Sequence, residues 1–220
     1  MKIFLDTSEI NEIRKWKDKV DGFTTNPTLM KKAGVTDYEA FCKEVLKEVE
    51  GKPISFEVFA DEFDEMERQA RIISGWGSNV YVKIPITNTK GESSLTLIEK
   101  LNKDGIKINV TALMCPVTIS IASNTPRIWS IFAGRIADTG LDPIMTFYKS
   151  HAHGNEQLLW ASPRAVQDIY QAEKAGADII TITPVILEKY LKMKNYNLKK
   201  LSLDTVKMFY NDAKEAGYKI

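Results

Sequence analysis

Cysteine and histidine are scarce in this chain of 220 residues. The two cysteines, Cys42 and Cys115, are too few and too far apart to indicate a disulfide framework or a metal cluster. The two histidines, His151 and His153, form a pair with no third ligand nearby in the sequence. We therefore expect neither a structural disulfide nor a metal site.

Long apolar runs and an excess of one charge are also missing. No run approaches the roughly 18 apolar residues of a membrane span, and Asp6 comes too early for a signal peptide. The net charge is +1, with both signs interspersed, which gives no electrostatic basis for binding nucleic acid or an anionic membrane. The sequence predicts a cytoplasmic protein without nucleic-acid or membrane partners.

What the chain does contain is an eightfold alternation of short β-branched or aliphatic runs with longer amphipathic stretches. The predicted strands are Ile3–Asp6, Gly22–Asn26, Ile54–Phe59, Val80–Ile86, Ile108–Met114, Ile128–Ala133, Gln157–Ser162 and Ile179–Thr183. Strands that alternate with helices pair in parallel, and eight such units favour a closed (β/α)8 TIM barrel over an open sheet. No Gly-rich fingerprint follows the first strand, which disfavours a dinucleotide fold.

Helical patterns fill the intervals between these strands. They are Glu9–Lys17, Asp37–Val49, Glu62–Ser74, Ser93–Asn102, Pro143–Lys149 and Arg164–Ala175, with poorer patterns at Pro116–Ala122 and Val185–Leu191. A further C-terminal helix is predicted at about residues 204–215. No linker or low-complexity segment interrupts the pattern, so we expect one barrel domain over residues 1–220.

Lys83 lies inside the fourth predicted strand, with apolar residues on both sides of it. An unpaired charge in a strand buried on both faces is costly, so the amine must find partners, lose its proton or take part in chemistry. Desolvated lysines are the usual amines that form a Schiff base with a carbonyl substrate. The alternative is a strand-end lysine whose amine reaches water.

Other polar residues stand at the carboxyl ends of the predicted strands, where barrel enzymes carry their active sites. They are Asp6, Asn26, Glu57, Asn109, Thr111, Ser130, Ser162 and Arg164. Strand alternation lets the polar members of each strand project inward together. Individually, Asp6 and Ser162 also suit helix caps and Asn26 suits a turn. Collectively they exceed what an apolar core tolerates without a purpose.

Seven segments resemble, in order and spacing, the motifs of the transaldolase family. They are Phe4–Thr7, Gly22–Thr28, Phe56–Val58, Val82–Pro85, Asn109–Thr111, Phe132–Ile136 and Ala161–Arg164, and the similarity runs from about residue 3 to residue 190. The resemblance implies a class I aldol mechanism without metal or cofactor and sugar phosphate substrates. It also implies a homo-oligomer, because the family's small members assemble through their C-terminal helices.

The same resemblance implies roles for single residues. Lys83 would attack C2 of a ketose, Asp6 would exchange the proton of the C4 hydroxyl, and Glu57 with Thr111 would hold a water. The positions that match donor-hydroxyl contacts are Asn26, Asn109 and Ser130, and those that match phosphate contacts are Arg135, Ser162 and Arg164. For Arg135, an ion pair with Asp138 is the competing interpretation.

Two positions bear on the type of reaction. The transferase branch of the family has Glu and Phe where the fructose-6-phosphate aldolases have Gln and Tyr, and this chain has Glu57 and Phe132. A tyrosine hydroxyl helps to protonate the three-carbon enamine, which then leaves as dihydroxyacetone. The prediction is a transaldolase that moves a dihydroxyacetone unit from fructose 6-phosphate or sedoheptulose 7-phosphate to an aldose phosphate.

Three departures keep alternatives open. Pro163 removes a backbone N–H beside the matched anion site, Trp160 has the parity of Ser162 and is expected to fill barrel volume, and Asn88–Glu92 looks like an insertion on the rim. The alternatives are a fructose-6-phosphate-type aldolase, a transaldolase for a modified sugar such as a sulfo-sugar, and a non-catalytic sugar-phosphate-binding protein.

Overall fold

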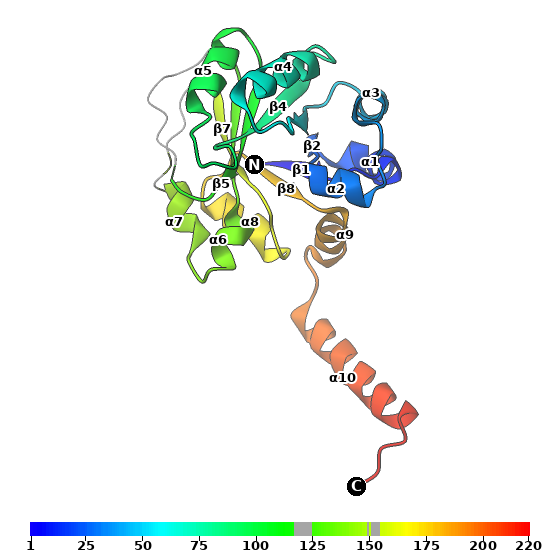
Figure 1. Ribbon diagram of the computed structural model, residues 1–220. Helices are drawn as coiled ribbons and strands as arrows, with labels where there is room; N and C mark the ends of the chain where they lie inside the picture. Colours follow the sequence, from blue (N-terminus) through cyan, green and yellow to red (C-terminus); the bar gives the residue numbers. More distant parts are fainter. Residues whose placement is uncertain (117–124, 149, 151–154) are drawn as a thin grey trace.

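Eight parallel strands form a closed barrel in the computed structural model, which describes residues 1–116, 125–148, 150 and 155–220 (Figure 1). The strands are β1 (Lys2–Asp6), β2 (Gly22–Thr24), β3 (Ile54–Glu57), β4 (Val80–Pro85), β5 (Ile108–Leu113), β6 (Arg127–Ile131), β7 (Glu156–Trp160) and β8 (Ile179–Ile182). Each strand pairs with the next, and β8 pairs with β1. The predicted (β/α)8 barrel is confirmed, and every strand overlaps its predicted range.

Helices follow the strands and surround the barrel (Figure 1). They are α1 (Ile10–Trp16), η1 (Lys17–Lys19), α2 (Pro27–Lys32), α3 (Tyr38–Glu48), α4 (Phe63–Ser74), α5 (Leu95–Lys103), α6 (Ala133–Ala137), α7 (Pro143–Tyr148), α8 (Gln167–Lys174) and α9 (Pro184–Met193). Two of them, α2 and α6, were not expected from the sequence. The predicted helix Pro116–Ala122 falls on residues 117–122, and the histidine pair on 151 and 153, all of which lie outside the described residues.

The start of α2 follows directly from its sequence. Asn26 is the N-cap, and its side-chain oxygen accepts a hydrogen bond from the Leu29 N–H at 3.0 Å. Pro27 takes the first helical position, where its missing N–H has no cost. Thr183 and Pro184 begin α9 in the same way. Both helices therefore begin at the mouth of the barrel, immediately after a strand.

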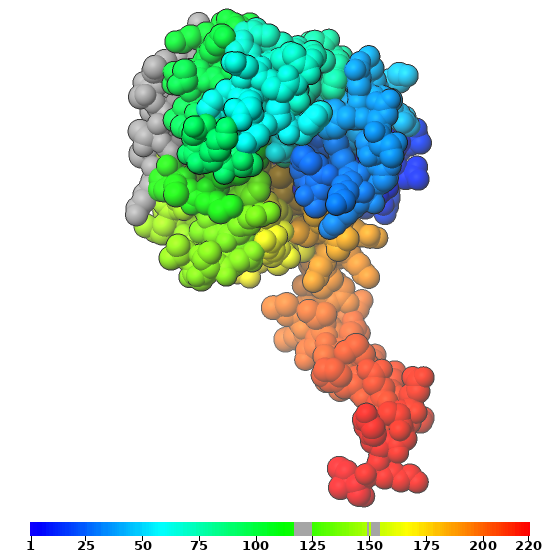
Figure 2. Space-filling view, in the orientation of Figure 1, coloured from blue at the N-terminus to red at the C-terminus, as the bar shows by residue number. Residues whose placement is uncertain are grey.

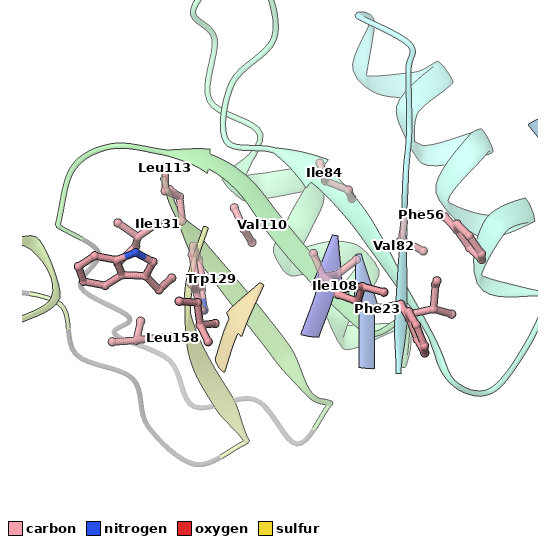
Figure 3. Close-up of a cluster of buried hydrophobic side chains, with 14 of the residues drawn as sticks. Phe23, Phe56, Val82, Ile84, Ile108, Val110, Leu113, Trp129, Ile131 and Leu158 are labelled. Carbon is pink, nitrogen blue, oxygen red and sulfur yellow. The ribbon is translucent and has the colours of Figure 1, made fainter. Parts of the chain in front are cut away.

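The larger part of the core lies between the barrel wall and the helices. Figure 3 shows a section of it, with Phe23, Phe56, Val82 and Val110 among its labelled side chains. These side chains point outward from the strands, toward the helices. Because successive side chains of a strand point to opposite faces, the alternate residues of the same strands point into the barrel. The apolar filling of the interior is a smaller cluster, made by Phe4, Tyr81, Ile128, Leu159, Ala161 and Ile179.

One helix stands apart from the barrel. The predicted C-terminal helix is α10 (Leu198–Glu215), which begins at Leu198 rather than near Asp204, and it projects away from the barrel (Figures 1 and 2). None of its residues is buried, although it carries large apolar side chains, such as Val206 and Phe209. Among the described helices, none is both long and apolar enough to cross a membrane.

Candidate active site

A cavity of about 360 Å³ opens at the carboxyl ends of the strands. This volume falls in the range of about 300–1,000 Å³ that is usual for small-molecule sites. Eight of the residues predicted from the sequence line it: Asp6, Asn26, Lys83, Ser130, Phe132, Arg135, Ser162 and Arg164. The other three predicted residues, Glu57, Asn109 and Thr111, lie outside this lining.

Lys83 is held inside the barrel by two oxygen partners. Only 7% of its side chain is exposed, and its Nζ donates a hydrogen bond to the Thr25 carbonyl at 2.8 Å. The Glu57 carboxylate lies 3.9 Å from the same nitrogen, since β3 and β4 pair with these two residues in register. The amine thus has partners, does not snorkel to water, and faces the cavity. A second candidate amine, that of Lys107 directly before β5, donates instead to the Ser78 carbonyl at the amino end of that strand.

Glu57 is fixed at its backbone as well as by Lys83. The Tyr38 hydroxyl donates to the Glu57 carbonyl at 2.6 Å, and the Gln69 side chain accepts from the N–H groups of Phe59 and Ala60. Burial raises the pKa of the Glu57 carboxyl, and nearby Lys83 opposes that shift. A carboxyl of this kind is suited to hold or pass on a proton.

Asp6 ends β1 and carries the second buried carboxyl group of the site. Burial raises its pKa, while Lys83 and hydrogen bonds from Thr24 and Asn26 lower it. Asn26 therefore has two contacts, because its amide N–H₂ lies 3.5 Å from Asp6 Oδ2 while its oxygen caps α2. Asp6 does not cap the helix that follows it, since α1 is capped by Glu9 without a side-chain bond.

Asn109 and Ser130 belong to a buried polar chain inside the barrel, and Ser130 is its member that lines the cavity. The Ser130 hydroxyl donates to Asn109 Oδ1 at 2.6 Å, and Asn109 Nδ2 donates to Ser55 Oγ at 3.0 Å. Three strands are linked in this way, which fixes both side chains. Thr111 is also buried, but its hydroxyl makes no hydrogen bond to Glu57 within the described part of the chain. The pairing of β5 with β6 changes register between Val110 and Leu113, the interval that contains Thr111.

The two arginines at the rim have different partners. The Arg135 guanidinium lies over the Phe132 ring, 5.6 Å from its centroid. Arg164 donates to Asp138 at 2.5 and 3.3 Å and to the Ser162 hydroxyl at 3.1 Å. Among the described residues, the ion pair of Asp138 is formed with Arg164 and not with Arg135, so the competing interpretation of Arg135 is wrong.

The backbone N–H groups of the turn after β7 are not free to bind an anion. Asp168 accepts hydrogen bonds from the N–H groups of Arg164 and Ala165, at 2.9 and 2.8 Å, so these donors are already used. Ser162 has a φ of 61°, in the left-handed region. A Cβ on Gly134 would lie 1.7 Å from the Ser162 carbonyl oxygen, so only glycine lets α6 approach this turn. An anion here meets side chains rather than a helix N-terminus.

Trp160 does not fill the barrel, contrary to the prediction. It is fully buried in the outer core, where its ring stacks on Phe147 of α7 at 5.0 Å between centroids. Leu159 and Ala161 are the inward residues of this segment. Ser162 reaches the cavity because it lies beyond the strand, where the left-handed turn breaks the alternation that the prediction assumed.

The sequence reasoning missed six residues of the cavity: Thr24, Thr28, Leu29, Lys32, Ala161 and Thr181. Thr28, Leu29 and Lys32 belong to α2, the helix that was not expected. The signal was present, because Asn26 followed by Pro27 is a typical helix start. Thr24 lies two residues before Asn26, so strand alternation places both side chains on the same face. Thr181 is the one polar residue within β8, and its position in the strand was the signal that could have found it.

These features define a parallel β/α barrel with a buried lysine and two buried carboxyl groups at its mouth. Comparison with known families gives the specific assignment: residues 3–220 match the family described as transaldolase/fructose-6-phosphate aldolase. A probable transaldolase from Bdellovibrio bacteriovorus is 35% identical over 228 residues, covering 100% of both chains. One from Thermoplasma volcanium is 37% identical over 203 residues, covering 87% of this chain and 88% of the relative. The chain belongs to the transaldolase/fructose-6-phosphate aldolase family, which confirms the resemblance read from its motifs.

Solved structures of similar shape support the fold. The 3-hexulose-6-phosphate synthase of Salmonella typhimurium matches with a TM-score of 0.55 and 15% identity, over 86% of this chain and 91% of that one. The orotidine 5'-phosphate decarboxylase of Pyrococcus horikoshii matches with a TM-score of 0.52 and 15% identity, over 82% and 88%. At such identities the likeness concerns the barrel alone.

The electrostatics of the site predict a pH-dependent effect of Lys83→Met on stability. The charge of Lys83 lowers the pKa values of Asp6 and Glu57, so its loss lets both rise further. A carboxyl whose pKa is raised by folding destabilises the folded state increasingly as the pH rises toward that pKa. Urea unfolding should therefore show a loss of stability that is about 1–3 kcal/mol larger at about pH 7.5 than at about pH 5. Lys107→Met serves as the control, and an equal loss at both pH values for Lys83→Met would contradict the coupling.

Proposed function

We propose that this protein is a Schiff-base transaldolase, with fructose 6-phosphate or sedoheptulose 7-phosphate as donor and an aldose phosphate as acceptor. The observation that carries the proposal is the amine of Lys83, buried and partnered by oxygen atoms, facing a cavity that also contains Asp6. No purely structural reason calls for this combination, because a buried ion pair is weak support for stability. Family membership supports the same reaction class.

In the proposed reaction, the neutral amine of Lys83 attacks C2 of the donor, and loss of water leaves a protonated imine. Asp6 takes the proton of the C4 hydroxyl as the C3–C4 bond breaks, and the bonding electrons pass to the imine nitrogen. The aldehyde leaves, and the three-carbon enamine stays on Lys83. An acceptor aldehyde then reverses these steps, with Asp6 returning the proton to the new hydroxyl.

The remaining side chains have supporting roles in this proposal. Glu57, 3.9 Å from the amine, is assigned the water that carries protons during imine formation and hydrolysis, and Thr111 is assigned to the same water. The polar chain of Ser130 and Asn109 presents fixed donors and acceptors to the donor's hydroxyls, as does Asn26 from the other side of the cavity. Fixed partners of this kind favour the reacting conformer of the bound sugar.

The terminal phosphate is assigned to Arg135, Ser162 and Arg164 at the rim. Both guanidinium groups suit an oxyanion, and Arg164 retains N–H groups beyond those given to Asp138 and Ser162. Because Pro163 has no N–H and Asp168 occupies the next two, the anion is held by side chains. This altered anion site is the observation that favours the alternative of a modified sugar, such as one with a sulfonate.

Phe132 supports transfer over simple cleavage. Its ring lines the cavity and lies against Arg135, and it offers no acidic hydroxyl to protonate the enamine. The enamine then persists until an acceptor aldehyde arrives. A fructose-6-phosphate-type aldolase is the alternative within the family, and a non-catalytic sugar-phosphate-binding protein is the alternative of another class.

Trapping of the imine tests the proposal directly. Borohydride reduction in the presence of fructose 6-phosphate should give a covalent adduct on Lys83, measured by intact mass and peptide mapping. Lys83→Met should abolish the adduct, whereas Lys107→Met, which removes an amine at the other end of the barrel, should retain it. Sugar binding without any adduct would favour the non-catalytic alternative, and an adduct elsewhere would remove Lys83 from the role of nucleophile.

Phe132→Tyr tests the type of reaction. A phenol hydroxyl near the enamine carbon supplies a proton, so release of dihydroxyacetone without acceptor should rise on the order of 10-fold or more. The measurement is dihydroxyacetone formed from fructose 6-phosphate, with and without erythrose 4-phosphate. Phe59→Tyr adds the same hydroxyl to an exposed ring outside the cavity lining and should change neither rate. Rapid acceptor-independent cleavage by the unaltered protein would favour the aldolase.

The proposal also includes assembly and location. We treat residues 1–220 as one barrel domain that acts in the cytoplasm as a homo-oligomer. Support for assembly comes from α10, whose apolar side chains include Val206 and Phe209, exposed by 60% and 63%. Most of the stability of a helix in a protein comes from packing of its apolar face, and α10 has no buried residue, so a second copy of the chain is the expected cover for this face.

Charges introduced on α10 should therefore dissociate the assembly. Val206→Asp combined with Phe209→Asp places two carboxylates one helical turn apart on the apolar side, which should yield monomers in sedimentation or light-scattering measurements. The combination of Lys207→Glu and Lys214→Glu changes the charge of the same helix without removing apolar surface, and it should leave the assembly intact. A monomer for the unaltered chain would refute this part of the proposal.

A further inference from the structure

Asp6 is linked by hydrogen bonds to two buried threonine hydroxyl groups. Thr24 Oγ1 donates to Asp6 Oδ1 at 2.7 Å, and the same oxygen lies 2.6 Å from Thr181 Oγ1. Both threonines are almost fully buried, and both line the cavity with Asp6. The three residues come from β2, β1 and β8, which are neighbours in the closed barrel. The contacts therefore form a continuous chain across three adjoining strands.

The number of available protons determines which group donates in each hydrogen bond of this series. Thr24 has a single hydroxyl proton, and an ionised Asp6 offers only acceptors, so that proton goes to Asp6 Oδ1. The contact between Thr24 and Thr181 then needs the proton of Thr181, which is donated to Thr24 Oγ1. When Asp6 is ionised, both hydroxyls thus point toward the carboxylate. Such aligned hydrogen bonds strengthen one another in a low-dielectric interior.

The two carboxylate oxygens of Asp6 are left in different situations. Oδ1 accepts the short bond from Thr24, whereas the one donor to Oδ2 among the described residues is the Asn26 amide, at 3.5 Å. The second contact is at the limit of hydrogen-bond length and is weak. Oδ2 is accordingly the oxygen that can accept a proton from a bound molecule without breaking the chain.

We propose that Thr24 and Thr181 are positioning residues for the acid/base of this site: their hydrogen bonds to Oδ1 favour the ionised form of Asp6 and leave Oδ2 to exchange the proton with the substrate. The inference rests on the proposed function for the role of Asp6, but the hydrogen-bond chain is a property of the free protein. It can therefore be tested apart from turnover.

Charged groups around Asp6 also influence its ionisation, and they must stay unchanged in such a test. Lys83 of β4 lowers the pKa of Asp6, and the nearby carboxyl of Glu57 on β3 is coupled to both groups. The two strands that pair with β1 contribute no charged residue, since β2 and β8 supply only Thr24 and Thr181 as polar groups to the cavity. Removal of one hydroxyl thus alters the hydrogen bonding of Asp6 without changing a charge.

The experiment follows the ionisation of Asp6 itself. Carbon-13 NMR of protein labelled at the aspartate carboxyl carbons, with the Asp6 signal identified by its loss in Asp6→Asn, gives the midpoint of its titration. Thr24→Val, which is nearly isosteric, should raise that midpoint on the order of one pH unit, because a hydrogen bond that favours the charged form is lost. Thr24→Ser keeps the hydroxyl and should restore the midpoint.

Two further variants complete the test. Thr181→Val should shift the midpoint in the same direction by less, since Thr24 still donates to Asp6, and it serves in place of Thr24→Val should that variant not fold. Thr25→Val removes a neighbouring hydroxyl that donates to the Ser55 carbonyl, and it should leave the Asp6 titration unmoved. An unchanged midpoint in both Thr24→Val and Thr181→Val, or an equal shift in Thr25→Val, would overturn the proposal.

Kinetics separate this inference from the proposed function. In an active enzyme, the acid limb of the pH profile of kcat/KM should move upward with the Asp6 midpoint in Thr24→Val, while borohydride trapping at Lys83 persists. A chain without turnover or trapping would refute the proposed function, yet the NMR shift would still support the hydroxyl chain. An unshifted midpoint in a fully active Thr24→Val variant would overturn the inference and leave the proposed function standing.

Discussion

The central constraint on this structure is the burial of an amine inside a closed parallel barrel. Taking the charge of Lys83 out of water is costly unless oxygen partners surround it. The Thr25 carbonyl and the Glu57 carboxylate meet that need, and they in turn require partners. The carboxylate of Glu57 is held in place through its backbone, because the Tyr38 hydroxyl donates to the main-chain carbonyl of Glu57 and β3 pairs with β4 in register. The partners of this one amine thus come from β3 and from the residue that follows β2, and they are connected to the helix that carries Tyr38.

The same barrel treats its two ends differently. Toward the amino ends of the strands, Arg127 and Glu156 form a buried ion pair, and the Trp129 indole N–H donates to the same carboxylate. That arrangement satisfies its members within the wall of the barrel. At the carboxyl ends, the polar groups of Asp6 and Lys83 face open space. Groups that are desolvated yet open to a cavity are those expected to bind and transform a small molecule.

Much of the fold could be predicted because the strands carry a strong signal. Eight β-branched or aliphatic runs that alternate with helical patterns admit few topologies, and Lys83 was recognisable as a charged residue within one of them. The errors arose where strand alternation ends at a turn and where side chains of separate loops meet. Trp160 was placed inside the barrel by counting parity through Ser162, where a left-handed turn breaks the count. Partners such as Asp138 for Arg164 depend on side-chain reach between separate loops, which a sequence pattern does not encode.

The contact between Thr24 and Thr181 joins residues 157 positions apart in the chain. The surroundings of Asp6 are therefore complete only once β8 has paired with β1 and closed the barrel. Contacts of such long sequence separation form late and slowly in folding. During synthesis, the first strand must remain unmatched on one edge until nearly the whole barrel has left the ribosome. A chain that ends before β8 would still contain every catalytic candidate named above, but without the closure that arranges them.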